Sequence, residues 1–215
     1  SWTQLSATAN AGDTSISVAG APTGWSVGDT IAIAPTDFDV FEVEERTITN
    51  IKGNTIFLDK ALNHQHYGRQ QNLGGGKVLD MRAEVTNLSR NISIVGSDEG
   101  ETKIDNSNSN PDYYTRSGYG GHTMYLPGAD IKIDGVEFAG LGISGEIGRY
   151  PVHFHHTGDA SDSYIKNSSV HHTFQRGIVV HRTNNLLVEG NIVYATKSHN
   201  NYKEDRVATG NRYIG

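Results

Sequence analysis

The sequence predicts an all-β protein in which a small antiparallel β unit is followed by a right-handed parallel β-helix. The chain has 25 Gly but only 5 Pro, as expected where many tight turns join short strands. From about residue 76, short apolar bursts recur, each followed by Gly, Asn or Asp. A sub-pattern within them returns at intervals of about 20 to 32 residues, the period of stacked solenoid coils, here called rungs.

Residues 1–75 are expected to form the antiparallel unit. Lys52-Gly53-Asn54 separates two alternating runs and indicates a hairpin. Strands are predicted at 14–18, 30–34, 46–51 and 55–58. His64 and His66 are interpreted as loop residues. An acidic group is interpreted as a solvated edge, with a calcium site as the alternative; it comprises Asp37, Asp39, Glu42, Glu44 and Glu45.

Residues 76–215 are expected to form the β-helix, with a long loop inserted at about 97–121. Tyr113 and Tyr114 in this loop are candidate substrate-binding residues, because tyrosine rings stack on sugars. A disordered loop is the alternative. Rung strands are predicted around the apolar bursts at 78–81, 92–95, 131–133, 136–138, 152–154, 164–165, 178–180, 186–188 and 192–193.

A histidine-rich stretch, 149–156, is the centre of the functional prediction. If it is a strand, Val152 and Phe154 face one side, and His153 and His155 face the other. The pattern returns at 178–181 and, degraded, at 201–204. Aligning the three copies places His155 beside His181 and then Glu204, and neighbouring rungs lie about 4.8 Å apart. The alternative is a row of solvated polar groups on a repeat surface.

Side chains so aligned can hold one divalent ion between rungs. His155, His181 and Glu204 are the candidate catalytic and metal-binding residues, with His153 and Asp205 as further ligands or outer partners. Two histidines and a carboxylate favour zinc, nickel, iron or copper, and calcium remains an alternative. If such a centre is catalytic, a histidine or Glu204 could transfer a proton.

Arginines beside the same rungs are candidate substrate-binding residues. Arg149 and Arg182, and also Arg176, can bind a substrate carboxylate in bidentate fashion. Ordinary ion pairs with acidic neighbours are the alternative.

Composition excludes several classes of function. The net charge of −6 gives no basic footprint for nucleic acid. There are no cysteines, so neither disulfides nor thiolate chemistry are expected. We find no apolar run long enough to span a membrane and no signal-peptide pattern. The abrupt start at Ser1-Trp2 favours a piece of a longer polypeptide.

Several landmarks resemble the G8-domain and parallel β-helix family of extracellular proteins, which has hyaluronan-binding, hyaluronidase and fibrocystin-like members. They keep their order along nearly the whole chain, and they lie at 2–14, 24–31, 82–85, 88–92, 121–124 and 148–155. The chain departs from the family in two places. The first half of the G8 domain is missing, and the apolar positions before Glu204 have become Asn201 and Lys203.

The resemblance implies a secreted or cell-surface β-helix and a polysaccharide or cell-surface glycan as partner. For some members it implies divalent-cation-assisted binding or depolymerisation of hyaluronan. We therefore expect a carbohydrate-active protein, with polysaccharide hydrolase or lyase activity left open. A non-catalytic adhesion or scaffold module of a larger surface protein is the alternative.

Overall fold

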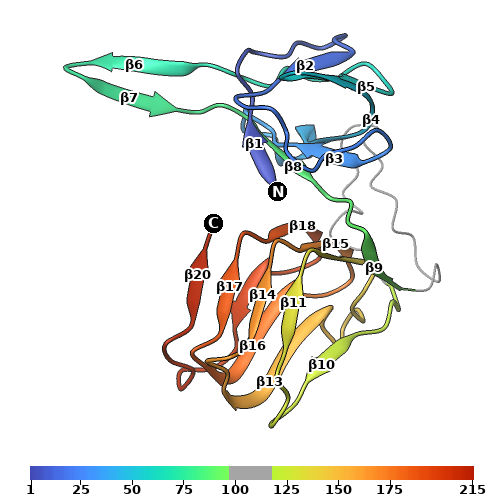
Figure 1. Ribbon diagram of the computed structural model, residues 1–215, viewed down its shortest axis with the longest axis vertical. Coiled ribbons are helices and arrows are strands. Elements are labelled where there is room, and N and C mark those ends of the chain that lie inside the picture. Colours follow the sequence, from blue (N-terminus) through green and yellow to red (C-terminus); the bar gives the residue numbers. More distant parts are fainter. Residues whose placement is uncertain (97–117) are drawn as a thin grey trace. The chain divides into compact units, whose positions relative to one another are not determined.

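The computed structural model describes residues 1–96 and 118–215, and these form two compact units that meet in sequence between Ser89 and Arg90 (Figure 1). Strands make up the regular structure of both. Among the described residues the only helical segment is a 3-10 turn, Val40–Glu42. The predicted all-β class is therefore confirmed. No helix in the described ranges is long and apolar enough to cross a membrane.

The first unit is built on a six-stranded sheet in the order β1-β8-β3-β4-β5-β2, with every pair antiparallel. Its strands are β1 (Trp2–Gln4), β2 (Ser15–Ser17), β3 (Thr30–Ile33), β4 (Glu44–Lys52), β5 (Thr55–Leu58) and β8 (Glu84–Asn87). The predicted hairpin is present, with Lys52 paired to Thr55 across Gly53. Apolar side chains at alternating strand positions, including Ile31, Ile48 and Val85, form its core.

The antiparallel unit extends beyond the predicted boundary at residue 75. The apolar burst at 78–81 contributes to a separate hairpin of β6 (Gln70–Gly74) and β7 (Lys77–Asp80), whose Val78 and Leu79 are exposed. The next strand, β8, pairs with β1 and β3 because its alternation buries Val85 opposite Ile33. The first parallel strand follows Arg90, so the β-helix begins later than residue 76.

The second unit is a parallel β-helix of three four-stranded sheets (Figure 1). One sheet contains β10 (Thr123–Tyr125), β13 (Val152–Asp159), β16 (Ile178–Asn184) and β19 (Asn201–Lys203). The second contains β11 (Lys132–Asp134), β14 (Tyr164–Lys166), β17 (Leu187–Glu189) and β20 (Arg212–Ile214). The third contains β9 (Ile92–Val95), β12 (Val136–Ala139), β15 (Ser169–Thr173) and β18 (Ile192–Thr196). Buried side chains from the three sheets form one core, among them Phe138, Phe154, Ile165, Val170, Val180 and Val188. The predicted insertion at 97–121 lies largely outside the described residues.

The register of the first sheet is the one the sequence predicts. Phe154 pairs with Val180, and Val180 pairs with Lys203. His155 pairs with His181. The ladder continues one residue further, where the Glu204 amide donates to the Val180 carbonyl at 3.0 Å. Three rungs therefore bring His155, His181 and Glu204 side by side.

Left-handed residues form columns at the corners between sheets. Gly135, Asn167 and Gly190 follow directly paired strands and have φ of 66°, 48° and 60°. The Asn167 side-chain amide donates to Asp134 at 2.9 Å, which offsets the cost of a non-glycine residue there. His156 and Arg182 form another such column, with φ of 54° and 45°, directly after the paired histidines.

The acidic group of the first unit is not a uniformly solvated edge. Glu44 is fully buried, where it forms an ion pair with buried Arg46 and accepts a hydrogen bond from the ring of buried His66 at 3.0 Å. The prediction that His66 is an ordinary loop residue was therefore wrong. Alternation along β4 turns Glu44, Arg46 and Ile48 to the same buried face, and pairing makes the two charges tolerable there.

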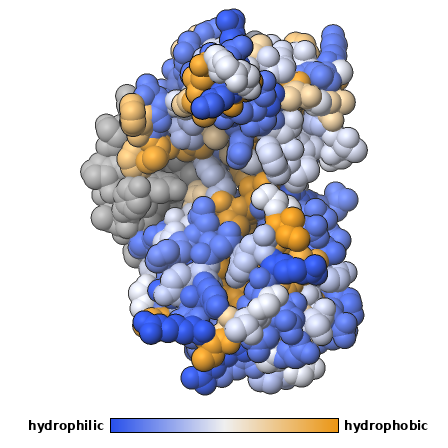
Figure 2. Space-filling view, turned by 90° about the vertical axis from the view of Figure 1, so that its left-hand side faces the viewer, coloured by the Kyte–Doolittle hydropathy of each residue, from blue (hydrophilic) through white to orange (hydrophobic). Residues whose placement is uncertain are grey.

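Much of the visible surface is polar. Figure 2 shows a mostly hydrophilic face on which apolar side chains form separate patches. Isolated exposed apolar residues are common on soluble domains.

Candidate metal centre

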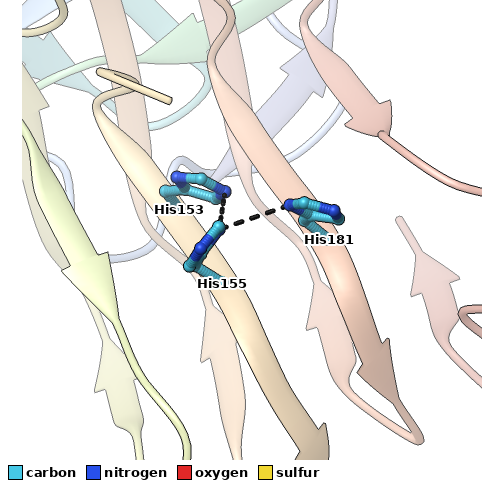
Figure 3. A group of neighbouring side chains, drawn as sticks. All are labelled: His153, His155 and His181. Atoms are coloured by element: carbon cyan, nitrogen blue, oxygen red, sulfur yellow. Dashed lines mark hydrogen bonds between the residues drawn. The ribbon is translucent and has the colours of Figure 1, made fainter. Parts of the chain in front are cut away.

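Three histidines converge on the outer face of the β10-β13-β16-β19 sheet (Figure 3). Along β13, Val152 and Phe154 enter the core, whereas His153 and His155 face the other way. His181 projects from the next strand, β16, towards the first two (Figure 3). His153 is buried, and the other two side chains are half-buried. We call these three residues the histidine centre.

The spacing of the ring nitrogens fits a single metal ion. His155 Nδ1 lies 3.3 Å from His153 Nε2 and 3.3 Å from His181 Nδ1. All three donor atoms lie within 4.8 Å of one another. Metal–nitrogen bonds of about 2.1 Å at tetrahedral angles place two ligand atoms about 3.4 Å apart. The donor set and its spacing therefore suit a transition-metal ion.

His153 is oriented by the backbone carbonyl of Gly148, in the turn before β13. Its Nδ1 lies 3.0 Å from the carbonyl oxygen of Gly148, which can only accept, so Nδ1 carries the proton. Burial of the ring lowers the pKa of His153 to about 4, and the bond to Gly148 offsets this only in part. The neutral ring consequently turns the Nε2 lone pair towards the other two histidines. An imidazole fixed through its other nitrogen is the usual arrangement of a metal ligand.

The other two imidazoles differ in their surroundings. Burial, followed by the nearby His156 and His181, lowers the pKa of His155. His181 directs Nδ1 to the centre, while its Nε2 lies 3.5 Å from Asp205 Oδ2. Asp205 also accepts from the amides of Arg182, Val207 and Ala208. Although burial opposes ionisation, these donors lower the Asp205 pKa. Asp205 thus lies behind His181, in the position of an outer partner.

Glu204 is the carboxylate that faces the histidine centre. Its Oε2 lies 3.6 Å from His181 Nδ1 and 3.9 Å from His153 Nε2. Its Oε1 accepts a hydrogen bond from the Tyr150 hydroxyl at 3.0 Å. The three histidines and Glu204 together supply three nitrogens and one oxygen, a set that suits zinc, nickel, iron or copper better than calcium.

The remaining predicted residues have other surroundings. Arg149 Nη1 lies 2.9 Å from His122 Nε2, so this arginine adjoins a histidine rather than the metal-binding atoms. Arg182 is exposed, and its amide is bonded to Asp205. Tyr113 and Tyr114 lie outside the described residues. Binding of substrate by Arg149 and Arg182 stays a prediction.

Sequence reasoning missed the roles of Tyr150 and Tyr202 in the site. Tyr150 stands three residues before His153, yet its hydroxyl reaches Glu204, 54 residues away. Tyr202 stacks with Arg176 beside the same carboxylate. The only available signal was that both tyrosines lie within or beside the aligned copies of the histidine pattern. That pattern predicts which residues pair between strands, but it does not predict side-chain contacts such as those of Tyr150 and Tyr202.

A second histidine pair, His171 and His172, lies on another sheet, where His171 is buried. Its Nε2 lies 3.3 Å from Glu137 Oε1, and its Nδ1 lies 2.7 Å from His172 Nδ1. The polar neighbours of the buried ring are therefore a carboxylate and a second imidazole.

Comparison with known proteins assigns the β-helix to a family. Residues 118–215, which include the histidine centre and Glu204, match the CEMIP beta-helix family. This part of the chain belongs to the CEMIP β-helix family. The resemblance inferred from the sequence landmarks is thereby confirmed.

Three curated relatives match across most of this chain. Mouse fibrocystin-L is 38% identical over 240 residues, covering 98% of this chain and 6% of the relative. The zebrafish (Danio rerio) cell surface hyaluronidase is 32% identical over 201 residues, covering 88% of this chain and 14% of the relative. The mouse cell migration-inducing and hyaluronan-binding protein is 32% identical over 207 residues, covering 91% of this chain and 15% of the relative. The chain thus spans a small part of each relative's length.

Proposed function

We propose that this member of the CEMIP β-helix family is the metal-binding segment of a longer cell-surface or secreted protein that binds an acidic polysaccharide such as hyaluronan. The names of two relatives, a cell surface hyaluronidase and a hyaluronan-binding protein, support the substrate class and location. The observation that carries the proposal is the convergence of three imidazole nitrogens on one point of the outer face, beside Glu204.

His153, His155 and His181 would hold the metal, with Glu204 as the adjoining carboxylate. Zinc and nickel suit these donors best, and calcium, an oxygen-seeking ion, suits them least. A bound divalent ion supplies positive charge that neutralises an acidic-sugar carboxylate. Gly148 and Asp205 orient the imidazoles from behind.

In the catalytic version of the proposal, the chain's own groups move the proton. Glu204 Oε2 faces the histidine centre, whereas both Asp205 oxygens already accept backbone hydrogen bonds. Glu204 is therefore the better proton acceptor of the two, and it would take up a proton only when substrate displaces its Oε2 from the ion; His155 is a half-buried imidazole of the same centre. Arg182 is exposed and would, in this version, bind a uronate carboxylate.

The decisive experiment combines metal analysis with polymer sizing. Purified protein should contain close to one transition-metal ion per chain, and His155→Ala should contain far less. Hyaluronan should bind to the wild type, and chelator should weaken that binding. A fall in polymer length that chelator abolishes would establish the catalytic version. Absence of any bound metal after loading with zinc, nickel, copper and calcium would contradict the proposal.

The second candidate function is a non-catalytic adhesion or scaffold module. It is favoured by the 38% identity to fibrocystin-L, whose name carries no sugar-cleaving activity. In that case, metal removal should lower the melting temperature while hyaluronan neither binds nor shortens.

A further inference from the structure

Glu204 stands on the most weakly held rung of the site. It directly follows β19, a strand of only three residues that pairs with β16 at three positions. The two end residues of this strand, Asn201 and Lys203, are exposed, so burial of side chains contributes little to holding the strand in place. Something else must hold the Glu204 carboxylate against the histidine centre.

Tyr150 and Arg176 make the contacts that hold it. Tyr150 is fully buried, and its hydroxyl donates to Glu204 Oε1 at 3.0 Å. The same hydroxyl accepts from Arg176 Nη1 at 2.8 Å, and that nitrogen lies 3.6 Å from Glu204 Oε1. A tyrosine and a guanidinium therefore engage one carboxylate oxygen together, which leaves Oε2 directed towards His153 and His181.

Aromatic rings fix the guanidinium in turn. Its central carbon lies 4.0 Å from the centre of the Tyr202 ring and 5.4 Å from that of Tyr150. The Tyr150 ring also meets the His153 ring edge-on, with centres 4.9 Å apart. We call Tyr150, Arg176 and Tyr202 the clamp. Its members come from the three rungs that supply the histidines and Glu204, so the clamp ties these rungs to one another.

We propose that Tyr150 and Arg176 are positioning residues that hold Glu204 by one oxygen and so present the other as the fourth ligand of the metal. This inference rests on the proposed function, since it assumes an ion at the histidine centre. It also assigns Arg176 a role different from the carboxylate-binding role considered from the sequence, because its Nη1 is already engaged by Tyr150 and Glu204.

The test measures metal affinity by titration with Zn²⁺ and with Co²⁺, whose visible absorption reports coordination. Tyr150→Phe removes only the hydroxyl, and Arg176→Met removes the charge. Each should weaken binding about 10-fold, the usual effect of losing an outer-shell partner, and should alter the Co²⁺ spectrum. Arg176→Lys should restore part of the affinity. Tyr164→Phe and Arg212→Met, on the β11-β14-β17-β20 sheet, are matched controls that should bind like the wild type.

Double variants separate positioning from a general loss of structure. In a Glu204→Gln background, adding Tyr150→Phe or Arg176→Met should cause no further loss of affinity, because the ligand that they position is already absent. Melting curves and circular dichroism verify that each variant is folded, and Tyr150→Phe keeps the buried ring.

Three outcomes would overturn the inference. A wild-type protein that binds no metal would defeat the proposed function and this inference with it. Normal affinity in Tyr150→Phe and Arg176→Met, with weakened affinity in Glu204→Gln, would defeat the inference alone. Additive losses in the double variants would show that the clamp acts independently of Glu204.

Discussion

The Nδ1 atoms of His155 and His181 lie 3.3 Å apart on neighbouring parallel strands, in a register that pairs the two residues directly. Two ring nitrogens at this distance must share a proton or a cation, because facing lone pairs repel. His153 adds a third nitrogen whose lone pair is turned the same way. The centre is therefore expected to depend on all three rings.

His155→Ala should abolish the stabilisation that metal confers. Metal that binds only the folded chain stabilises it by about 2.7 kcal/mol when the free ion is at about 100 times the dissociation constant. Adding zinc should thus raise the melting temperature of the wild type and leave that of the variant unchanged. His64→Ala, in the first unit, is the matched control and should respond like the wild type. An equal rise in His155→Ala would place the metal elsewhere.

His153 should make the metal-free β-helix less stable as the pH falls. Burial lowers its pKa from 6.5 to about 4, so between these values the unfolded chain binds the proton and the folded chain does not. The free energy of unfolding is therefore highest above pH 6.5 and falls as the pH drops towards 4, by about 3 kcal/mol in total.

Urea unfolding in chelator at pH 7 and pH 5, followed by far-UV circular dichroism, measures this slope. His153→Gln should flatten it, since glutamine does not titrate. An unchanged slope in the variant would assign the pH dependence to other groups. Both tryptophans, Trp2 and Trp25, lie in the first unit, so their fluorescence reports that unit separately.

Glu44 should make the first unit lose stability in a more acidic range of pH than the one that affects the β-helix. Burial opposes its ionisation, but hydrogen bonds from His66 and from the amides of Asn63 and His64, together with Arg46, lower its pKa from 4.5 to about 2. Its stabilising contribution is present above pH 4.5 and is lost as the pH falls towards 2.

Glu44→Gln should therefore destabilise the first unit at pH 7 by about 3 to 5 kcal/mol, because it leaves the buried Arg46 without its charge partner. Tryptophan fluorescence in a urea titration measures this. Asp37→Asn, at an exposed acidic position, should change stability little. A similar small effect in Glu44→Gln would show that Arg46 is solvated.

Gly177→Ala should disturb the join between rungs. A Cβ at this position would lie 2.5 Å from Val193 Cγ1 and 2.6 Å from the Asn200 carbonyl oxygen, closer than packed atoms approach. The Gly177 amide also donates to His199 at 3.0 Å, just before β19. We expect a loss of about 1 to 3 kcal/mol from overpacking, read from thermal unfolding. Gly20→Ala, where a Cβ meets nothing within 4 Å, is the control. Equal melting temperatures for both variants would contradict the close packing.

The strand register that brings His155, His181 and Glu204 together could be predicted from the sequence, because it depends only on the spacing of the repeated pattern. Alternation turns Val152 and Phe154 into the core, and superposing that pattern on the next rungs fixes the partners of His155. The same logic explains why the strands of the β-helix could be placed near their observed positions.

The contacts around the site could not be predicted, because they involve residues outside the periodic pattern. Tyr150 precedes its strand and Arg176 precedes the next, so no register relates either one to Glu204. The unit boundary was misplaced because the burst at 78–81 looks like a rung strand although it forms an exposed hairpin. Glu44 was misjudged because a charged residue at a core-facing position is acceptable only with partners, such as His66, that lie far along the chain.

The short pairing of β19 has a mechanical consequence. Tension on the carboxyl end of the chain loads β20 and then β19, each held by three residue pairs, before it reaches the longer β16. Glu204 would be pulled away while the three imidazoles stayed in place, so a stretched molecule would keep a nitrogen-only site and lose its carboxylate. That order of unzipping would couple the set of donor atoms at the histidine centre to applied force.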